Sequence, residues 1–88
     1  MKIKSGFEIT NIADDYMLVP VGDQVEHFNG VVVLNEVSAF LLEKLKSDRT
    51  SEELALLLAD AFDVDLATAQ KDVHTAIEKM MSIGVIYD

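Results

Sequence analysis

Residues 30–36 read Gly-Val-Val-Val-Leu-Asn-Glu, and this stretch divides the chain into two halves of different character. Val31 to Leu34 form an apolar run without interruption, whereas a strand with one face in water alternates apolar and polar residues. Asn35 suits a helix N-cap, and Glu36 suits the first turn, where the helix dipole favours an acid. The stretch therefore predicts a short strand that ends at Asn35. Either both of its faces are covered by the protein, or one face or edge is left for a partner.

The part of the chain before this run is strand-like. Alternation over residues 7–12 and the β-forming residues of 16–21 predict two strands joined by a turn at Asp14-Asp15. Pro20 has no backbone N–H, so this part of the second strand is expected at a sheet edge or at the strand's end.

The connection to the third strand carries a strong turn signal. Asn29-Gly30 is a dipeptide typical of hairpin turns, and residues 24–28 before it are interpreted as a short extra arm. Together with the run at 31–34, these segments predict an antiparallel meander of three strands.

The part of the chain after the run is helical. Apolar residues at spacings of three and four predict three helices, which begin after Asn35, after Thr50 and at about Leu66, the last ending near Ser82. Thr50 and Glu53 have the spacing of a capping box, which marks the start of the second helix.

The C-terminal segment is expected to stop the third helix and return to the core. Gly84 suits the position just beyond a helix C-terminus, and Val85, Ile86 and Tyr87 are expected to pack on the core. The resulting order is β-β-β-α-α-α. We therefore expect residues 1–88 to form a single α+β domain of winged-helix-like architecture, with a three-stranded antiparallel sheet followed by three helices.

Composition narrows the classes of function. The chain of 88 residues carries 16 acidic and 7 basic residues, a net charge of -9, with Arg49 its single arginine. Nucleic-acid affinity depends on Lys and Arg that neutralise phosphates, so this balance argues against DNA or RNA binding. A basic protein or peptide is attracted more easily by such a field.

The same composition indicates the compartment. The chain has no cysteine, and no apolar run approaches the roughly 20 residues that span a bilayer. The first nine residues, MKIKSGFEI, lack the apolar stretch of a signal peptide, so we expect no membrane association and a cytoplasmic location.

No motif predicts catalysis, a metal or a cofactor. The histidines His27 and His74 are far apart in the sequence, and metal sites need three or four arranged ligands. Asp63 and Asp65 begin like a calcium loop, but the later ligand positions of that motif are not filled. Phosphate-binding and nucleophile motifs are absent from the sequence. The sequence therefore predicts a protein that is not an enzyme.

Several segments together resemble the PqqD-like family. Residues 34–41, LNEVSAFL, resemble that family's LNETAAxI stretch, and residues 48–50 are similar to its DGxxT turn. Residues 72–77 and 83–86 resemble its DVxxFLxxLxxxGLI ending. The resemblance covers nearly the whole chain at consistent spacing.

Two differences from the family pattern indicate which members of the family this sequence resembles most. Arg49 stands where the family often has glycine, and the 22–30 connection is longer than in the PqqD of cofactor biosynthesis. These differences favour the wider group of stand-alone PqqD-like proteins over a role in PQQ biosynthesis itself.

The resemblance implies a non-catalytic peptide chaperone. Such proteins act as recognition elements that bind the leader segment of a ribosomally made precursor peptide and present it to a modifying enzyme, often a radical SAM enzyme. The leader adds as a strand beside the third strand, in a groove closed by the third helix. Carried over to this sequence, the implied peptide-binding residues are Val31, Val32, Val33, Leu34, Asp72, Val73, Thr75, Ala76, Lys79 and Met80.

Alternatives remain open at this point. An acidic winged-helix regulatory or protein-interaction domain has the same topology, and the open strand edge is equally able to pair with a second copy to form a homodimer. Strand alternation places Val31 and Val33 on one face and Val32 and Leu34 on the other, without deciding which pair faces the core.

Overall fold

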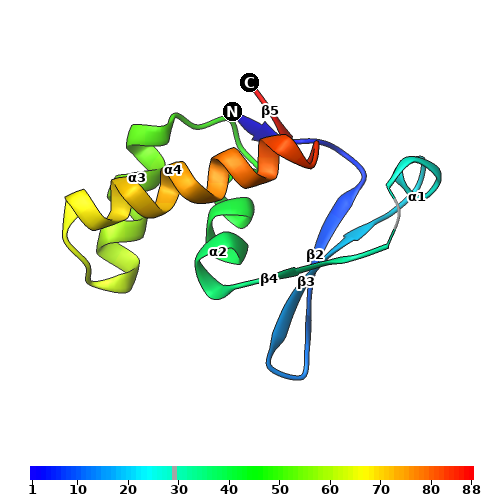
Figure 1. The fold of residues 1–88 in the computed structure, drawn as a ribbon, viewed down its shortest axis with the longest axis horizontal. Coiled ribbons are helices and arrows are strands. Elements are labelled where there is room, and N and C mark those ends of the chain that lie inside the picture. The colour runs from blue at the N-terminus through cyan, green and yellow to red at the C-terminus, as the bar shows by residue number, and fades with distance from the viewer. Residues whose placement is uncertain (29) are drawn as a thin grey trace.

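The chain folds into two small sheets and four helices over residues 1–28 and 30–88, the part that this computed structural model describes. In chain order the elements are β1 (Lys2–Ile3), β2 (Phe7–Ile12), β3 (Asp15–Pro20), α1 (Gln24–His27), β4 (Val32–Leu34), α2 (Glu36–Lys44), α3 (Ser51–Phe62), α4 (Leu66–Ser82) and β5 (Ile86–Tyr87). The larger sheet lies at one end of the molecule, and α3 and α4 lie toward the other (Figure 1). The predicted α+β class, with a three-stranded sheet followed by three helices, is confirmed.

The larger sheet is an antiparallel meander in the order β2-β3-β4, as the sequence predicts. β3 pairs with β2 on one side, with Ile9 opposite Leu18, and with β4 on the other side, with Val32 opposite Leu18. β2 and β4 are therefore the two edge strands. The predicted turn includes Asn29, which lies outside the described residues.

The prediction of a short extra arm over residues 24–28 is wrong, because this segment forms the single helical turn α1. Gly22 adopts a φ of 59°, which glycine tolerates without strain, and turns the chain after β3. The Val25 N–H then donates to the Gly22 carbonyl at 3.2 Å, and the Phe28 N–H donates to the Gln24 carbonyl at 2.8 Å. These local bonds satisfy backbone groups that an extended arm would offer to a neighbouring strand.

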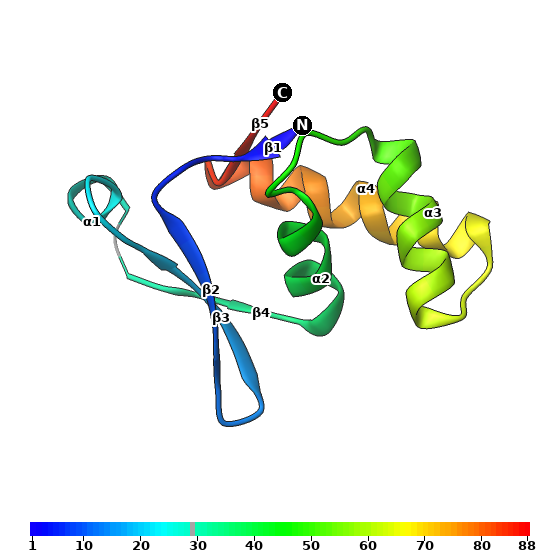
Figure 2. The same cartoon turned by 180° about the vertical axis from the view of Figure 1, so that it is seen from behind.

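The ends of the chain pair with each other, which the sequence does not predict. β1 and β5 form a two-stranded antiparallel ribbon with Ile3 opposite Ile86. The Ile3 N–H also donates to the Leu45 carbonyl at 2.9 Å, which fixes the ribbon to the end of α2. Figures 1 and 2 show both termini on the same side of the molecule, above α4. Ile86 is buried as expected, whereas Tyr87 is exposed.

Each long helix begins at a residue that caps it. Asn35 accepts a hydrogen bond from the Ser38 N–H at 2.8 Å, and Thr50 and Glu53 form the predicted capping box. Asp65 caps α4 by accepting from the Thr68 N–H at 2.7 Å. These caps satisfy backbone donors that the helices leave unpaired, and they fix where the preceding segments end.

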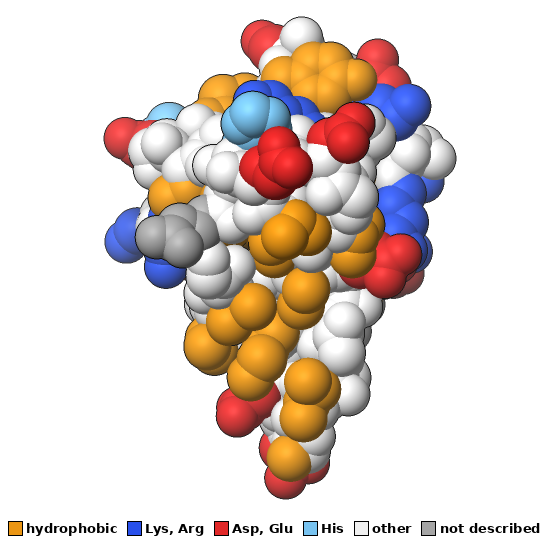
Figure 3. Space-filling model, turned by 90° about the vertical axis from the view of Figure 1, so that its right-hand side faces the viewer, with side chains coloured by type: hydrophobic (Ala, Val, Ile, Leu, Met, Phe, Trp, Pro, Cys, Tyr) orange, Lys and Arg blue, Asp and Glu red, His pale blue; other side chains and the backbone are white. Residues whose placement is uncertain are grey.

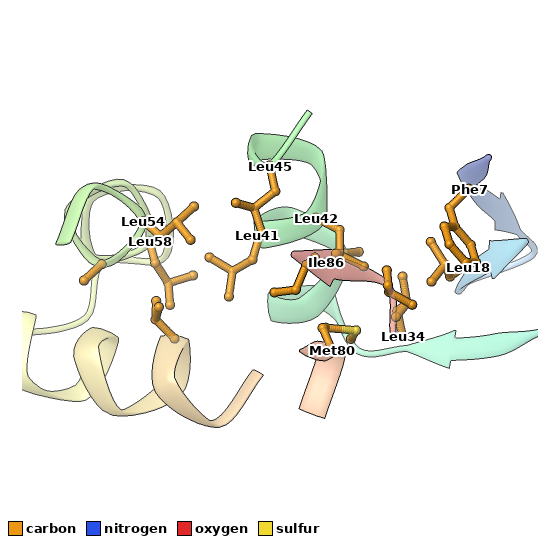
Figure 4. Packing of buried hydrophobic residues seen from close by; sticks show 14 of the residues in the cluster. Phe7, Leu18, Leu34, Leu41, Leu42, Leu45, Leu54, Leu58, Met80 and Ile86 are labelled. Atoms are coloured by element: carbon orange, nitrogen blue, oxygen red, sulfur yellow. The ribbon is translucent and has the colours of Figure 1, made fainter. Parts of the chain in front are cut away.

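One hydrophobic core joins the sheet to the helices. Its buried side chains come from β2, β3, β4, α2, α3, α4 and β5, and they include Leu18, Leu42, Leu58, Val73 and Val85. Figure 4 shows α2 in the middle of this cluster, with its leucines directed toward both α3 and the sheet. The sheet and the helices are thus packed on one another through α2.

Candidate functional site

The candidate site begins with the free edge of β4. β4 pairs with β3 through Tyr16 opposite Leu34, Met17 opposite Val33 and Leu18 opposite Val32. On its other edge, β4 has no strand partner within residues 1–28 and 30–88. Alternate residues of an edge strand direct their N–H and C=O groups away from the sheet, so β4 offers backbone donors and acceptors to an additional strand.

The two faces of β4 lie in different environments. Leu34 is 5% exposed and belongs to the core, and Val32 is half-buried against it. Val31 and Val33 point the other way and are 54% and 61% exposed. The alternative that the sequence leaves open is therefore resolved: Val32 and Leu34 form the inward pair, and Val31 and Val33 form the outward pair.

The outward pair continues an apolar surface across the sheet. Val33 is opposite Met17, and Met17 is opposite Thr10, so these three side chains form one row on the face turned away from the helices. Figure 3 looks onto the sheet end of the molecule and shows a band of hydrophobic side chains there. Met17 was not among the predicted site residues. Its position follows from the register between β3 and β4, which no single stretch of sequence shows.

The second element of the candidate site is α4, whose predicted residues divide into two groups. Val73 and Met80 are 1% and 3% exposed and pack into the core, so they position the helix. Asp72 and Ala76 are half-buried, and Lys79 is exposed. Their spacings of four and three place them along one side of the helix.

Thr75, three residues after Asp72 and four before Lys79, borders the same side of the helix and is exposed. Its hydroxyl donates to the Lys71 carbonyl at 3.1 Å. Its hydroxyl is therefore already engaged on its own helix.

β4 and α4 lie on the same side of the molecule. The opposite edge strand, β2, shares a hollow with α2 and the end of α3, which places α3 at the β2 edge. Figure 1 shows α4 in front of α3, and Figure 2, seen from behind, shows α3 in front. Leu34 and Met80 point into the same end of the core (Figure 4). Leu34 of β4 and Met80 of α4 thus contribute to one core.

The space beneath α4 is closely packed. A void of about 10 Å³ lies between α2 and α4, and its lining includes Ala76, Ile77 and Met80. The contact between α2 and α4 therefore leaves no room for a ligand.

Capping interactions of neighbouring residues fix the end of β4 and both ends of α4. Asn35 ends β4 by starting α2, and Asp65 starts α4. The pKa of the Asp65 carboxyl is held below its ordinary value because the Thr68 backbone N–H donates to the charged form. At the other end of α4, Gly84 has a φ of 80°, and the Val85 N–H donates to the Met80 carbonyl at 3.0 Å. This is the predicted glycine stop, in a Schellman arrangement.

The titratable groups do not gather into a centre for chemistry in the described part of the chain. His74 lies 3.3 Å from the Glu78 carboxylate on the exposed side of α4, and His27 is exposed in α1. No group of three or more His, Cys, Asp or Glu side chains in residues 1–28 and 30–88 is placed to hold a metal ion. Among the same residues, no helix is both long enough and apolar enough to cross a bilayer.

Comparisons with known proteins identify the family of the chain and a shared fold. The family model described as Coenzyme PQQ synthesis protein D (PqqD) matches residues 15–86, which include all of the predicted site. A search of the curated proteins gives no match. Among solved structures, the chain is similar to TbiB1 in complex with the TbiA(beta) leader peptide, with a TM-score of 0.71 and 18% sequence identity over 100% of both chains. At this identity the likeness shows a shared fold.

Proposed function

Because the chain belongs to the PqqD family, we propose that it is a non-catalytic peptide chaperone that binds the leader segment of a ribosomally made precursor peptide. The leader adds as a strand to β4, and the chaperone delivers the precursor to a modifying enzyme, for which a radical SAM enzyme is our candidate. The cytoplasm, where such precursors are made, is the proposed location.

The observation that carries this proposal is the free edge of β4 beside α4. The outward residues Val31 and Val33 leave more than half of their surface in water, although aliphatic side chains gain free energy from burial. An added strand would satisfy the backbone groups of the edge and cover part of this apolar surface. The backbone bonds would supply affinity, and the side chains that flank the edge would supply selectivity.

The side chains of an added strand would alternate between two surroundings. One set would extend the outer row formed by Thr10, Met17 and Val33. The other set would face the side of α4 that carries Asp72, Ala76 and Lys79. A leader that fits this site therefore has apolar residues at alternate positions on one face, and a mixture of small apolar and polar contacts on the other.

The fold comparison supports the same proposal. The solved structure of TbiB1, which shares the fold over its full length, contains a leader peptide. The transfer of that property to this chain rests on the PqqD family match and on the open β4 edge.

A winged-helix regulator that binds nucleic acid is the competing function, and the charges disfavour it. α3 carries no Lys or Arg, and α4 carries only Lys71 and Lys79. A recognition helix needs side chains that reach phosphates and base edges. A homodimer joined through two β4 edges remains a competitor for the same surface, and the experiment below separates it from leader binding.

The test is a titration of ¹⁵N-labelled protein with synthetic leader peptides. The peptides are taken from short precursor-like reading frames adjacent to the gene, and a scrambled peptide of the same composition is the control. Leader binding predicts saturable amide shifts over residues 31–34 and 72–80. Shifts confined to other residues would show that the peptide-binding site is assigned wrongly.

A second measurement tests strand addition itself. N-methylation of alternate peptide bonds removes donors that face β4 in one register and donors that face solvent in the other. Strand addition predicts that one series of methylated peptides loses binding while the other keeps it. Equal affinity of both series would exclude backbone pairing. Shifts of residues 31–34 that depend on protein concentration in the absence of peptide would identify the homodimer instead.

A further inference from the structure

An apolar hollow lies at the opposite edge of the sheet and is not used by the proposed leader site. Its volume is about 560 Å³. β2 and β3 contribute Ile9 and Tyr16, α2 contributes Phe40, and α3 ends there at Phe62. None of its lining residues belongs to β4 or α4. The hollow and the β4 edge therefore share no residue.

Aromatic side chains form the walls of this hollow. The rings of Phe40 and Phe62 meet edge to face, with centroids 5.4 Å apart and an interplanar angle of 79°. Tyr16 is half-buried like both of them, so each ring keeps part of its surface open. Edge-to-face packing holds the two phenylalanines in a fixed arrangement, which lowers the entropy cost of binding an apolar side chain between them and the sheet.

The rim of the hollow is mainly acidic. Glu36 and Glu43 lie on it, and Asp60 and Asp63 flank the α3 residues that line it. α3 has no basic residue in its last turn, so the partial negative charge of the helix C-terminus is not offset there.

One cation lies on the same rim. The Lys44 ammonium is 5.4 Å from the centroid of the Phe40 ring and covers that face. Glu43 pairs with Lys46 at 3.2 Å. The remaining balance of charge is negative, and it adds to the net charge of -9 on the whole chain. This field attracts a cationic partner and repels an acidic one.

We propose that this hollow docks a basic protein segment that carries one bulky apolar side chain with Lys or Arg beside it. The apolar side chain would enter between Phe40, Phe62 and the β2-β3 face, and the basic residues would meet the acidic rim. A second copy of this chain fits poorly, because it brings the same net charge of -9. The inference goes beyond leader binding, since it assigns a second partner to a surface at the opposite edge of the sheet.

The identity of that partner rests on the proposed function. If β4 binds the leader, the basic segment belongs to the modifying enzyme, because a chaperone that delivers a peptide must hold both partners at once. The two sites lie at opposite edges of one sheet, so the geometry allows simultaneous binding.

The experiment uses the full chain, labelled with ¹⁵N, and three synthetic pentapeptides with blocked ends. The first is Lys-Lys-Phe-Lys-Lys, the second has Ala in place of Phe, and the third has Glu in place of every Lys. Docking predicts saturable amide shifts near Ile9, Tyr16, Phe40 and Phe62 with the first peptide. Loss of either the aromatic ring or the positive charges should weaken binding by about tenfold or more.

Other outcomes would overturn the proposal. Equal binding of the Ala peptide would show a charge effect without an apolar anchor, and equal binding of the Glu peptide would show an apolar effect without charge selection. Absence of saturable shifts at the hollow, or shifts at residues 31–34 instead, would show that no such site exists. Shifts at the hollow that grow with protein concentration alone would assign it to a second copy.

Matched substitutions sharpen the test. Ala61 is exposed and lines the hollow, so Ala61→Lys should obstruct it and repel the basic peptide without disturbing the core. Ala67→Lys adds the same charge at another exposed alanine, in the first turn of α4. We expect the first variant to weaken binding of the Phe peptide about tenfold and the second by less than about twofold. Equal loss in both would overturn the site assignment. These titrations contain no leader peptide. A negative result at the hollow therefore does not count against leader binding, and a failure of leader binding does not count against docking at the hollow.

Discussion

The two faces of β4 carry nearly the same side chains but lie in different surroundings. Leu34 is 5% exposed and packs in the core, whereas Val33, its neighbour in the chain, is 61% exposed. Side-chain type does not explain this difference, since both residues are aliphatic. The pairing of β4 with β3 explains it, because this register turns Leu34 toward α2 and leaves Val33 on the sheet's outer face. The comparison separates residues that hold the fold from residues available to a ligand.

The largest expected effect is the loss of stability when the inward-facing Leu34 is shortened. Leu34→Ala removes buried methyl groups from the core cluster that includes Met80 and Ile86 and leaves a cavity, so the free energy of unfolding should fall by about 3 kcal/mol. Urea unfolding followed by circular dichroism measures this change. Val33→Ala is the matched control, and its loss should stay below about 1 kcal/mol because the side chain is exposed. Equal losses in the two variants would mean that the faces are assigned wrongly.

The next effect is on the outward side and concerns binding. Val33→Glu places a charge where the outer row meets an added strand, so leader affinity should fall about tenfold or more while the fold remains. Fluorescence anisotropy with a labelled leader measures the affinity, and the amide spectrum checks the fold. Ile12→Glu is the control, since Ile12 is also an exposed residue of the sheet but lies on β2, away from the β4 edge. A similar loss in both variants would indicate general charge repulsion.

The elements that the sequence predicts well are those with local signals. Asn35 and the pair Thr50 and Glu53 mark helix starts, because their side chains bond to backbone groups only three residues away. Gly84 marks a helix end, because its φ of 80° disfavours other residues. Such signals depend on a few neighbouring residues, so they can be read without the fold.

The elements that could not be predicted from the sequence depend on contacts between residues far apart in the chain. β1 and β5 pair residues from opposite ends of the chain, and strands of two residues are too short to show alternation. The inward face of β4 follows from its register with β3, which the order of residues in Val31–Leu34 does not contain. On α4, the same limit applies to Val73 and Met80, which were predicted to line the groove and lie in the core of the free protein.

A smaller effect is expected from the charged residue on the flank of the site. Lys79 is exposed on the side of α4 that carries Asp72 and Ala76, and Lys71 is an exposed lysine of the same helix outside the predicted site. Lys79→Ala should weaken leader binding a few-fold, since exposed ionic contacts contribute little and the alkyl stem adds some packing. Lys71→Ala makes the same change in charge. If the two variants weaken binding equally, α4 acts through its overall charge and its flank does not contact the leader.

The smallest effect concerns the start of α4. The pKa of Asp65 is lowered by the Thr68 N–H, so the folded state binds this proton less readily than the unfolded state does. Its contribution to stability is therefore present above the unperturbed pKa of about 3.9 and is lost as the pH falls through the lower folded pKa.

Asp65→Asn keeps a capping side chain but removes the charge, so wild type should be slightly more stable than this variant at neutral pH. The difference between the two proteins in free energy of unfolding should disappear as the pH is lowered below about 4. Asp48, whose pKa is lowered by the N-terminal amine, is present in both proteins, so its effect cancels in the difference. Urea unfolding of both proteins at several pH values measures this difference in stability. A stability difference that does not depend on pH would show that the charge of Asp65 does not stabilise α4. Leader affinity at neutral pH should be unchanged, because the cap lies outside the row of Asp72, Ala76 and Lys79.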